Sequence, residues 1–181
     1  IQQLKNAKAD AIWVADVSGA IAFTKQAADF GLIPQTPLIG HALLSNFIVN
    51  ATGNALTNVP GNVGYTPDIA TPQSKAFAAA FKARHNRLPS DTEGQAYNGT
   101  MVLLQGVKLA GSTKPLDVTK ALRGAEVETL YGKATVRPAD NQLLIPNYIA
   151  RVKVADGVLR PVIEQSYPAT ITPPASPLCK L

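Results

Sequence analysis

Three short polar clusters each follow an apolar run, and they hold most of the side chains that could do chemistry in this chain. They are Asp16–Gly19, His41–Ser45 and Tyr65–Asp68. Because the carboxyl ends of parallel strands share one edge of a sheet, we expect the clusters to lie on one rim, where ligands bind beside helix N-termini. A helix that begins after Ser18 offers backbone amides suited to a carboxylate or another anion. The alternative is structural, with Ser18 capping that helix and Asp16 turning the chain.

Known catalytic motifs are missing from the sequence. It contains no nucleophile elbow, phosphate-binding loop, dinucleotide fingerprint or zinc-binding helix motif. Asp16, His41 and Ser45 are the residue types of a nucleophile triad, but they fall in separate loops without an elbow. Two histidines and one cysteine cannot supply a multi-histidine or thiolate metal site. We therefore expect a protein that is not an enzyme and needs no metal or cofactor, with a hydrolase as the less favoured alternative.

The composition of the chain narrows the classes of protein to which it could belong. The chain has 181 residues, 46% of them hydrophobic and 16% charged, which is typical of one globular domain or two small ones. No apolar run reaches the roughly 18–20 residues that cross a bilayer, so no membrane insertion is expected. The net charge of +5 comes from scattered basic residues. The densest group, Lys82, Arg84 and Arg87, has no interleaved aromatic residues, which favours a solvated helix face over a nucleic-acid partner.

Hydrophobic periodicity predicts an α/β fold in which strands and helices alternate before a final antiparallel hairpin. Short apolar runs indicate strands buried on both faces, and Ser18, Thr71 and Gly31 are typical of helix ends. Asp156-Gly157 is a two-residue hairpin signal between strands 148–154 and 158–165. Other expected strands are 11–15, 37–40 and 61–66. Expected helices are 20–30, a short one from about 45, 72–86, 90–110 and 116–123.

The longest expected helix opens at Ser90 and Glu93, which have the spacing of a capping box. Its apolar residues form two adjoining stripes, so we expect it to be buried on most sides. The first residues, 1–5, read as the middle or end of an amphipathic helix, which predicts that the chain begins inside a larger protein. The proline-rich tail, 168–177, is expected to be extended surface chain.

In order and spacing, several stretches resemble the second half of the type I periplasmic solute-binding proteins of the branched-chain amino-acid (Leu/Ile/Val) ABC uptake family. The resemblance covers nearly the whole chain, and no single motif is diagnostic. The matching stretches are Leu4-Lys5 with Ala9-Asp10-Ala11-Ile12, Ile21 to Leu32, Gly40 to Asn46, Phe77-x3-Phe81 with Arg87-x-Pro89, Ala96-Tyr97 and Gly132 to Val136.

This resemblance implies a periplasmic protein of two lobes that closes on a small solute and delivers it to the permease subunits of an ABC importer. It implies that residues 1–89 belong to the second lobe, that 90–144 return to the first, and that 145–181 add closing strands and a tail to the second. The N-terminal half of the same protein would be the missing partner. The residues expected to contact the solute in the interlobe cleft are Asp16, Val17, Ser18, His41, Ala42, Tyr65 and Tyr97.

One position departs from the family's pattern. Amino-acid binders of the family place a glutamate in the loop that matches His41–Ser45, where it holds the ammonium group of the ligand. This loop has no acidic residue. The departure favours a carboxylate without an ammonium group, aromatic or aliphatic, although Asp16 is a candidate replacement. For Tyr97 a buried core position is the alternative role. For the whole protein, a ligand-sensing regulatory or receptor domain of the same fold is the alternative function.

Overall fold

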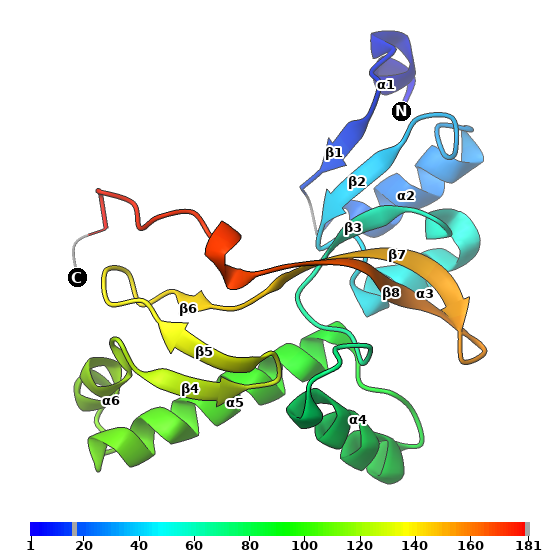
Figure 1. Ribbon diagram of the computed structural model, residues 1–181. Helices are drawn as coiled ribbons and strands as arrows, with labels where there is room; N and C mark the ends of the chain where they lie inside the picture. Colours follow the sequence, from blue (N-terminus) through cyan, green and yellow to red (C-terminus); the bar gives the residue numbers. More distant parts are fainter. Residues whose placement is uncertain (16–17, 180–181) are drawn as a thin grey trace. The chain divides into compact units, whose positions relative to one another are not determined.

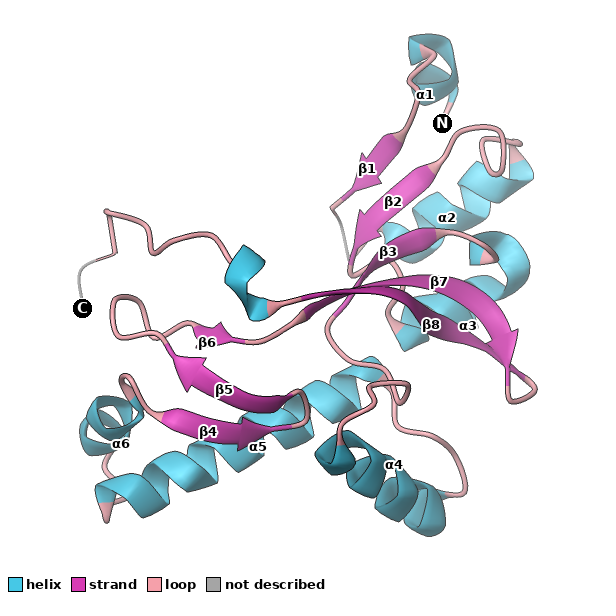
Figure 2. Cartoon of the chain, viewed as in Figure 1, coloured by secondary structure: helices cyan, strands magenta, loops and turns pink. Residues whose placement is uncertain are grey.

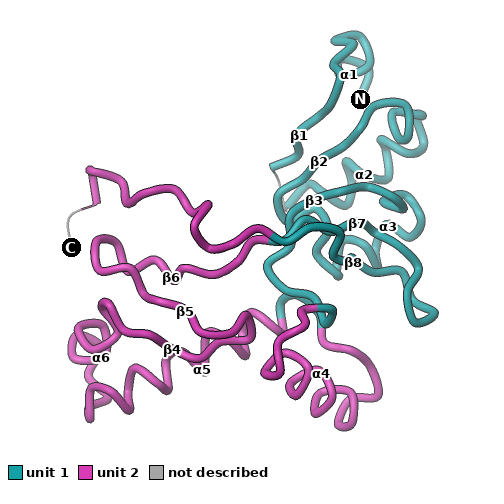
Figure 3. Tube along the Cα trace, viewed as in Figure 1, with its two compact units in different colours: residues 1–68, 90–92, 148–166 teal, residues 69–89, 93–147, 167–181 magenta. Residues whose placement is uncertain are grey.

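The computed structural model describes residues 1–15 and 18–179 of the chain (Figure 1). The chain forms two compact units, each assembled from separate stretches of sequence (Figure 3). Unit 1 contains residues 1–68, 90–92 and 148–166, and unit 2 contains residues 69–89, 93–147 and 167–181. Helices and strands are present in both units (Figure 2), so the predicted α/β class is confirmed.

Unit 1 is built on a five-stranded sheet with the order β1-β2-β3-β7-β8. β1, β2 and β3 are parallel neighbours, whereas β7 pairs with β3 in the antiparallel sense. The predicted hairpin at Asp156-Gly157 is confirmed, and both of its turn residues have positive φ angles. The elements of this unit are α1 (Gln2–Ala7), β1 (Ile12–Val14), α2 (Ala20–Asp29), β2 (Leu38–His41), α3 (Asn46–Thr52), the 3₁₀ helix η1 (Gly53–Leu56), β3 (Pro60–Val63), β7 (Asn147–Ala155) and β8 (Val158–Tyr167).

The core of unit 1 lies between the sheet and the α2–α3 layer. Leu43 and Leu44, which follow β2, are completely buried. A Cβ atom on Gly40 would stand 2.3 Å from the Leu43 side chain, and one on Gly61 would stand 3.0 Å from that of Leu44. Glycine in β2 and β3 therefore allows these leucines to pack directly against the strand backbones.

Unit 2 combines three helices with a small antiparallel sheet of order β4-β5-β6. Thr71 caps its first helix as predicted, with the Ser74 N–H donating to Thr71 Oγ1 at 3.1 Å. The longest helix begins at Asp91, directly after the predicted capping residue Ser90. The elements are α4 (Pro72–His85), α5 (Asp91–Ala110, whose first two residues belong to unit 1), α6 (Pro115–Leu122), β4 (Glu126–Thr129), β5 (Gly132–Val136), β6 (Leu143–Leu144) and the 3₁₀ helix η2 (Ala169–Ile171).

Unit 2 differs from the sequence-based predictions in two respects. Strands β4 and β5 were not predicted, although Val127, Thr129, Ala134 and Val136 alternate with exposed residues at the period of a strand. Helix α5 is not buried on most sides within this chain. Its buried residues are small or polar, whereas its large apolar residues are exposed; the exposed ones include Tyr97, Met101, Leu103, Leu104 and Leu109.

The unit boundary differs from the segment boundary that the resemblance implies. Residues 69–89 group with unit 2, while the expected segment 1–89 keeps them with residues 1–68. The physical reason is that α4 packs on α5, where the rings of Phe77 and Tyr97 stack with centroids 4.3 Å apart. Which lobe of a larger protein each unit represents stays a prediction. No helix within residues 1–15 and 18–179 has both the length and the hydropathy of a membrane-spanning helix.

Candidate functional site

The carboxyl ends of β1, β2 and β3 lie at one edge of the unit 1 sheet, because the three strands are parallel and adjacent. The three polar clusters that follow these strands were predicted to share one rim, and the strand arrangement confirms this for their described residues. Strand ends of this kind are where open α/β sheets bind ligands. We therefore take this edge as the candidate site.

The cluster after β1 is described only in part. Asp16 and Val17, two of the expected contact residues, lie outside the described residues. Ser18 is exposed. It does not occupy the predicted N-cap position, since α2 is capped by Gly19, which has no side chain to accept a hydrogen bond.

The cluster after β2 begins with the last residue of the strand itself. His41 pairs in register with Asn62 of β3, and its side chain is exposed. Ala42 follows with a φ angle of 59°, in the left-handed region, so the chain turns sharply away from the sheet. Both residues were predicted to contact the solute. His41 therefore has a side chain available at the rim, whereas Ala42 can contribute mainly its backbone groups.

An acidic side chain reaches this cluster from a distant part of the sequence. The Asp91 carboxylate accepts a hydrogen bond from the Ser45 hydroxyl at 2.7 Å and another from the Asn46 backbone N–H at 3.1 Å. In return, the Asp91 backbone N–H donates to Asn46 Oδ1 at 3.0 Å. The N-terminus of α3 is thus already satisfied by a protein carboxylate. Sequence reasoning missed this role because Asp91 lies 45 residues after Asn46, the first residue of α3.

The cluster after β3 is held by the strand hairpin. Arg160 of β8, which is 8% exposed, donates to both carboxylate oxygens of Asp68, at 2.7 and 3.0 Å, and to Asp156 at 2.9 Å. Burial lowers the pKa of the Arg160 guanidinium, but its hydrogen bonds to the two acids outweigh this effect and raise it overall. Tyr65 is only 1% exposed. It packs in the core, so it does not present the open ring that a role in ligand contact predicts.

Tyr97 lies in unit 2, where it helps to line a hollow of about 430 Å³. Its ring is 42% exposed, so the alternative of a buried core tyrosine does not hold within this chain. Polar side chains around the hollow are already paired. Asn98 accepts from the Leu130 N–H at 2.8 Å, and Gln73 donates to Glu128 at 2.9 Å. The hollow therefore offers mainly apolar contact.

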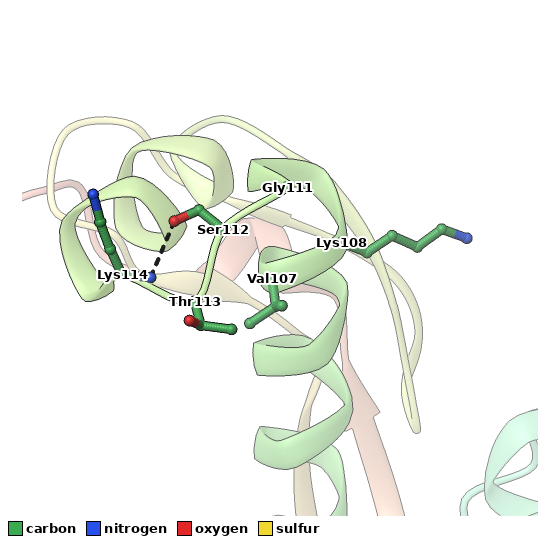
Figure 4. A pocket seen from close by; sticks show the side chains of 6 residues that line it. All are labelled: Val107, Lys108, Gly111, Ser112, Thr113 and Lys114. Atoms are coloured by element: carbon green, nitrogen blue, oxygen red, sulfur yellow. Dashed lines mark hydrogen bonds between the residues drawn. The ribbon is translucent and has the colours of Figure 1, made fainter.

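A second hollow in unit 2, of about 580 Å³, lies at the C-terminal end of α5 (Figure 4). Ser112 Oγ accepts from the Lys114 backbone N–H at 3.1 Å and donates to Asp117 at 2.8 Å. These bonds stabilise the start of α6, and Lys108 points away from Ser112 in this view. This hollow is therefore formed by the loop that connects α5 to α6. In the part of the chain that the structure describes, no group of three or more His, Cys, Asp or Glu residues is placed to hold a metal ion.

Residues 1–157 match a family model described as periplasmic binding protein. No curated protein sequence matches the chain. Among similar solved structures is an ABC transporter substrate-binding protein from Sphaerobacter thermophilus, which is 25% identical with a TM-score of 0.80 over 93% of this chain and 48% of that one. The chain therefore spans about half the length of the structures that it matches.

Two further structures agree in fold. One is a solute-binding protein of an ABC transporter from Rhodopseudomonas palustris BisB5 in complex with 3,4-dihydroxybenzoic acid, 24% identical with a TM-score of 0.78 over 93% of this chain and 47% of that one. The other is a leucine-, isoleucine-, valine-, threonine- and alanine-binding protein from Brucella ovis, 20% identical with a TM-score of 0.77 over 93% and 46% of the two chains.

Proposed function

Because the chain belongs to the periplasmic binding protein family, we propose that it is part of an extracytoplasmic solute-binding protein that serves an ABC importer. The carboxyl edge of β1, β2 and β3 would form its share of the solute site. The parallel, adjacent arrangement of these strands is the observation that carries the proposal. Several structurally similar proteins are binding components of ABC transporters, which supports transport over the sensing alternative.

We further propose that the solute is a small carboxylic acid, with a benzoate-type acid binding at least as well as leucine. The loop from His41 to Ser45 has no acidic residue, and the carboxylate of Asp91, which lies beside it, already accepts two hydrogen bonds from the start of α3. Among the described residues of this cluster, an ammonium group would therefore have to share the Asp91 carboxylate with the start of α3. His41, exposed at the end of β2, is instead placed to donate to a carboxylate or hydroxyl.

Calorimetric titration of the full-length protein with benzoate, 4-hydroxybenzoate and leucine tests this proposal. His41→Ala should weaken binding of the aromatic acids by about tenfold to a hundredfold, because a hydrogen bond to a charged group contributes about 1.5–3 kcal/mol. The matched control is His85→Ala, which removes the other histidine of the chain, in α4 of unit 2, and should leave affinity unchanged. Binding of leucine alone, with no loss in His41→Ala, would contradict the proposal.

A further inference from the structure

A side-chain oxygen on the unit 1 sheet is buried without a hydrogen bond. Asn62 lies in β3, and its Oδ1 has no hydrogen-bond partner among the residues that the structure describes. A buried polar atom destabilises a protein unless a hydrogen bond compensates for its lost contact with water. Asn62 is not one of the residues that were predicted to contact the solute. A donor within reach of this oxygen would therefore be held there.

The strand register places His41 beside Asn62. The two residues pair directly in the parallel ladder of β2 and β3, which are neighbouring strands in the sheet (Figure 1). Neighbouring strands lie about 4.8 Å apart, so short side chains on one face can meet. Gly40 and Gly61, one position earlier in each strand, face the two buried leucines that follow β2. Since successive side chains alternate between the faces of a sheet, His41 and Asn62 share the opposite face.

The strand on the other side of Asn62 places no donor side chain directly opposite it. There Asn62 pairs with Ile149 of β7, whose side chain has no polar atom. Arg151, two positions further along β7 and on the same face, donates to the Glu164 carboxylate and to a backbone carbonyl. Of the two side chains directly opposite Asn62, only that of His41 therefore carries an N–H group.

We propose that Asn62 is a positioning residue of the solute site: its Oδ1 accepts a hydrogen bond from one ring nitrogen of His41, which directs the other ring N–H to the solute carboxylate. An imidazole that donates from both nitrogens is protonated, so the site gains a positive charge opposite the carboxylate. The second proton comes from solvent. The same charge would repel the ammonium group of an amino acid, which favours acids that lack this group. The inference rests on the proposed function, because it concerns how His41 binds the acid.

Calorimetric titration of the full-length protein with benzoate tests the role of Asn62. Asn62→Leu removes the acceptor with little change in size and should weaken benzoate binding about threefold to tenfold. In the His41→Ala background the same change should cause no further loss, because Asn62 acts through the imidazole. The matched control is Asn50→Leu, since Asn50 is exposed in α3, and it should leave affinity unchanged. Asn62→Ala gives the same test if the leucine variant does not fold.

¹⁵N NMR of the full-length protein with labelled histidine observes the ring nitrogens of His41 directly. The resonances missing from His41→Ala identify them. In the benzoate complex at neutral pH both nitrogens should carry protons, and the doubly protonated fraction should be smaller in the Asn62→Leu complex. A role of Asn62 in folding alone would not change this fraction.

Separate outcomes test the inference and the proposed function. Benzoate binding that Asn62→Leu leaves unchanged would overturn the inference while the proposed function stands. Losses that add independently in the double variant, or His41 nitrogens with the same protonation in both complexes, would overturn it in the same way. If neither benzoate nor 4-hydroxybenzoate binds to the unmodified protein, the proposed function fails and this inference fails with it.

Discussion

Arg160 is a buried charged residue of unit 1 that pairs with two carboxylates. Its side chain is 10% exposed and joins two carboxylates that lie far apart in sequence, Asp68 after β3 and Asp156 at the hairpin turn. Asp68 is also the last residue of unit 1 before the chain passes into unit 2. The arginine therefore anchors the end of the segment that leaves the sheet.

Replacing Arg160 with alanine should destabilise the full-length protein by about 3 kcal/mol, because removing one partner leaves a partly buried carboxylate without its counter-charge. The matched control is Arg87→Ala. Arg87 pairs with Glu93 at 2.8 Å, but its side chain is 55% exposed and solvent screens the pair, so the loss should be clearly smaller than that of Arg160→Ala. Urea denaturation of the two variants measures the difference. Equal losses would show that the Arg160 network has no special role in stability.

In helix α5, small residues determine how closely neighbouring side chains can approach the helix. Gly94 and Gly106 are among its buried residues, and a Cβ atom on Gly106 would stand 2.8 Å from the Leu122 side chain and 2.9 Å from that of Val118. Gly99 of the same helix has no atom within 4 Å of that position. Gly99 and Gly106 thus have the same helical backbone, but Gly106 is closely packed whereas Gly99 has open space beside it.

Gly99→Ala should stabilise the full-length protein by up to about 1 kcal/mol, the difference in helix propensity between alanine and glycine. Gly106→Ala should lower stability by about 1–3 kcal/mol, since overpacking against α6 exceeds that gain. Thermal denaturation followed by circular dichroism compares the pair. A Gly106→Ala variant as stable as Gly99→Ala would mean that α6 moves away at little cost.

The β7–β8 hairpin carries a pH-dependent ion pair. Hydrogen bonds from Lys153 first and then from Arg151 lower the pKa of the Glu164 carboxyl. A lowered pKa in the folded state stabilises the protein above the unfolded value of about 4.3, and this contribution disappears as pH falls through the folded pKa.

The stability difference between the full-length protein and its Glu164→Gln variant should therefore be largest near pH 7 and fall toward zero below about pH 4. Urea denaturation at a series of pH values measures it. Because these side chains are exposed, roughly 1 M salt should reduce the difference at neutral pH. A difference that stays constant from pH 7 to pH 3 would show that the pair does not act through its charge.

At the scale of the whole molecule, large apolar side chains remain exposed on both units. Trp13 and Ile39 are exposed in unit 1, and Tyr97, Met101 and Leu104 in unit 2. The last three lie four and then three residues apart, so they share one face of α5. Each unit therefore presents an apolar surface of the kind that normally packs against another layer.

The isolated 181-residue chain should consequently lack a cooperative thermal transition as a monomer, because burial of each large side chain contributes about 1.5–3 kcal/mol that it cannot gain alone. Circular dichroism on heating, with the oligomeric state measured in parallel, tests this. The full-length protein at the same concentration is the reference and should melt in one sharp step. A sharp transition from the monomeric fragment would contradict the prediction.

Much of the local structure could be predicted from the sequence because it depends on neighbouring residues. The cap at Thr71, the αL residue Gly31 after α2 and the Asp156-Gly157 turn follow from backbone chemistry within a few positions. The parallel strands followed from short apolar runs, and with them the shared rim that includes Ser18 and His41. Strands β4 and β5 were missed because neither contains an apolar run: charged residues, Glu126 and Glu128 in β4 and Lys133 in β5, interrupt the buried ones.

Other features depend on contacts between residues that are far apart in the sequence. Only the tertiary structure determines these contacts. Asp91 reaches the start of α3 across 45 positions, and Arg160 reaches Asp68 across 92. Tyr65 is buried although it follows a strand in a predicted binding cluster, since the packing around it, and not its place in the sequence, sets its exposure. Periodicity predicts that a helix such as α5 has apolar stripes, but only the arrangement of the neighbouring layers determines whether they are covered.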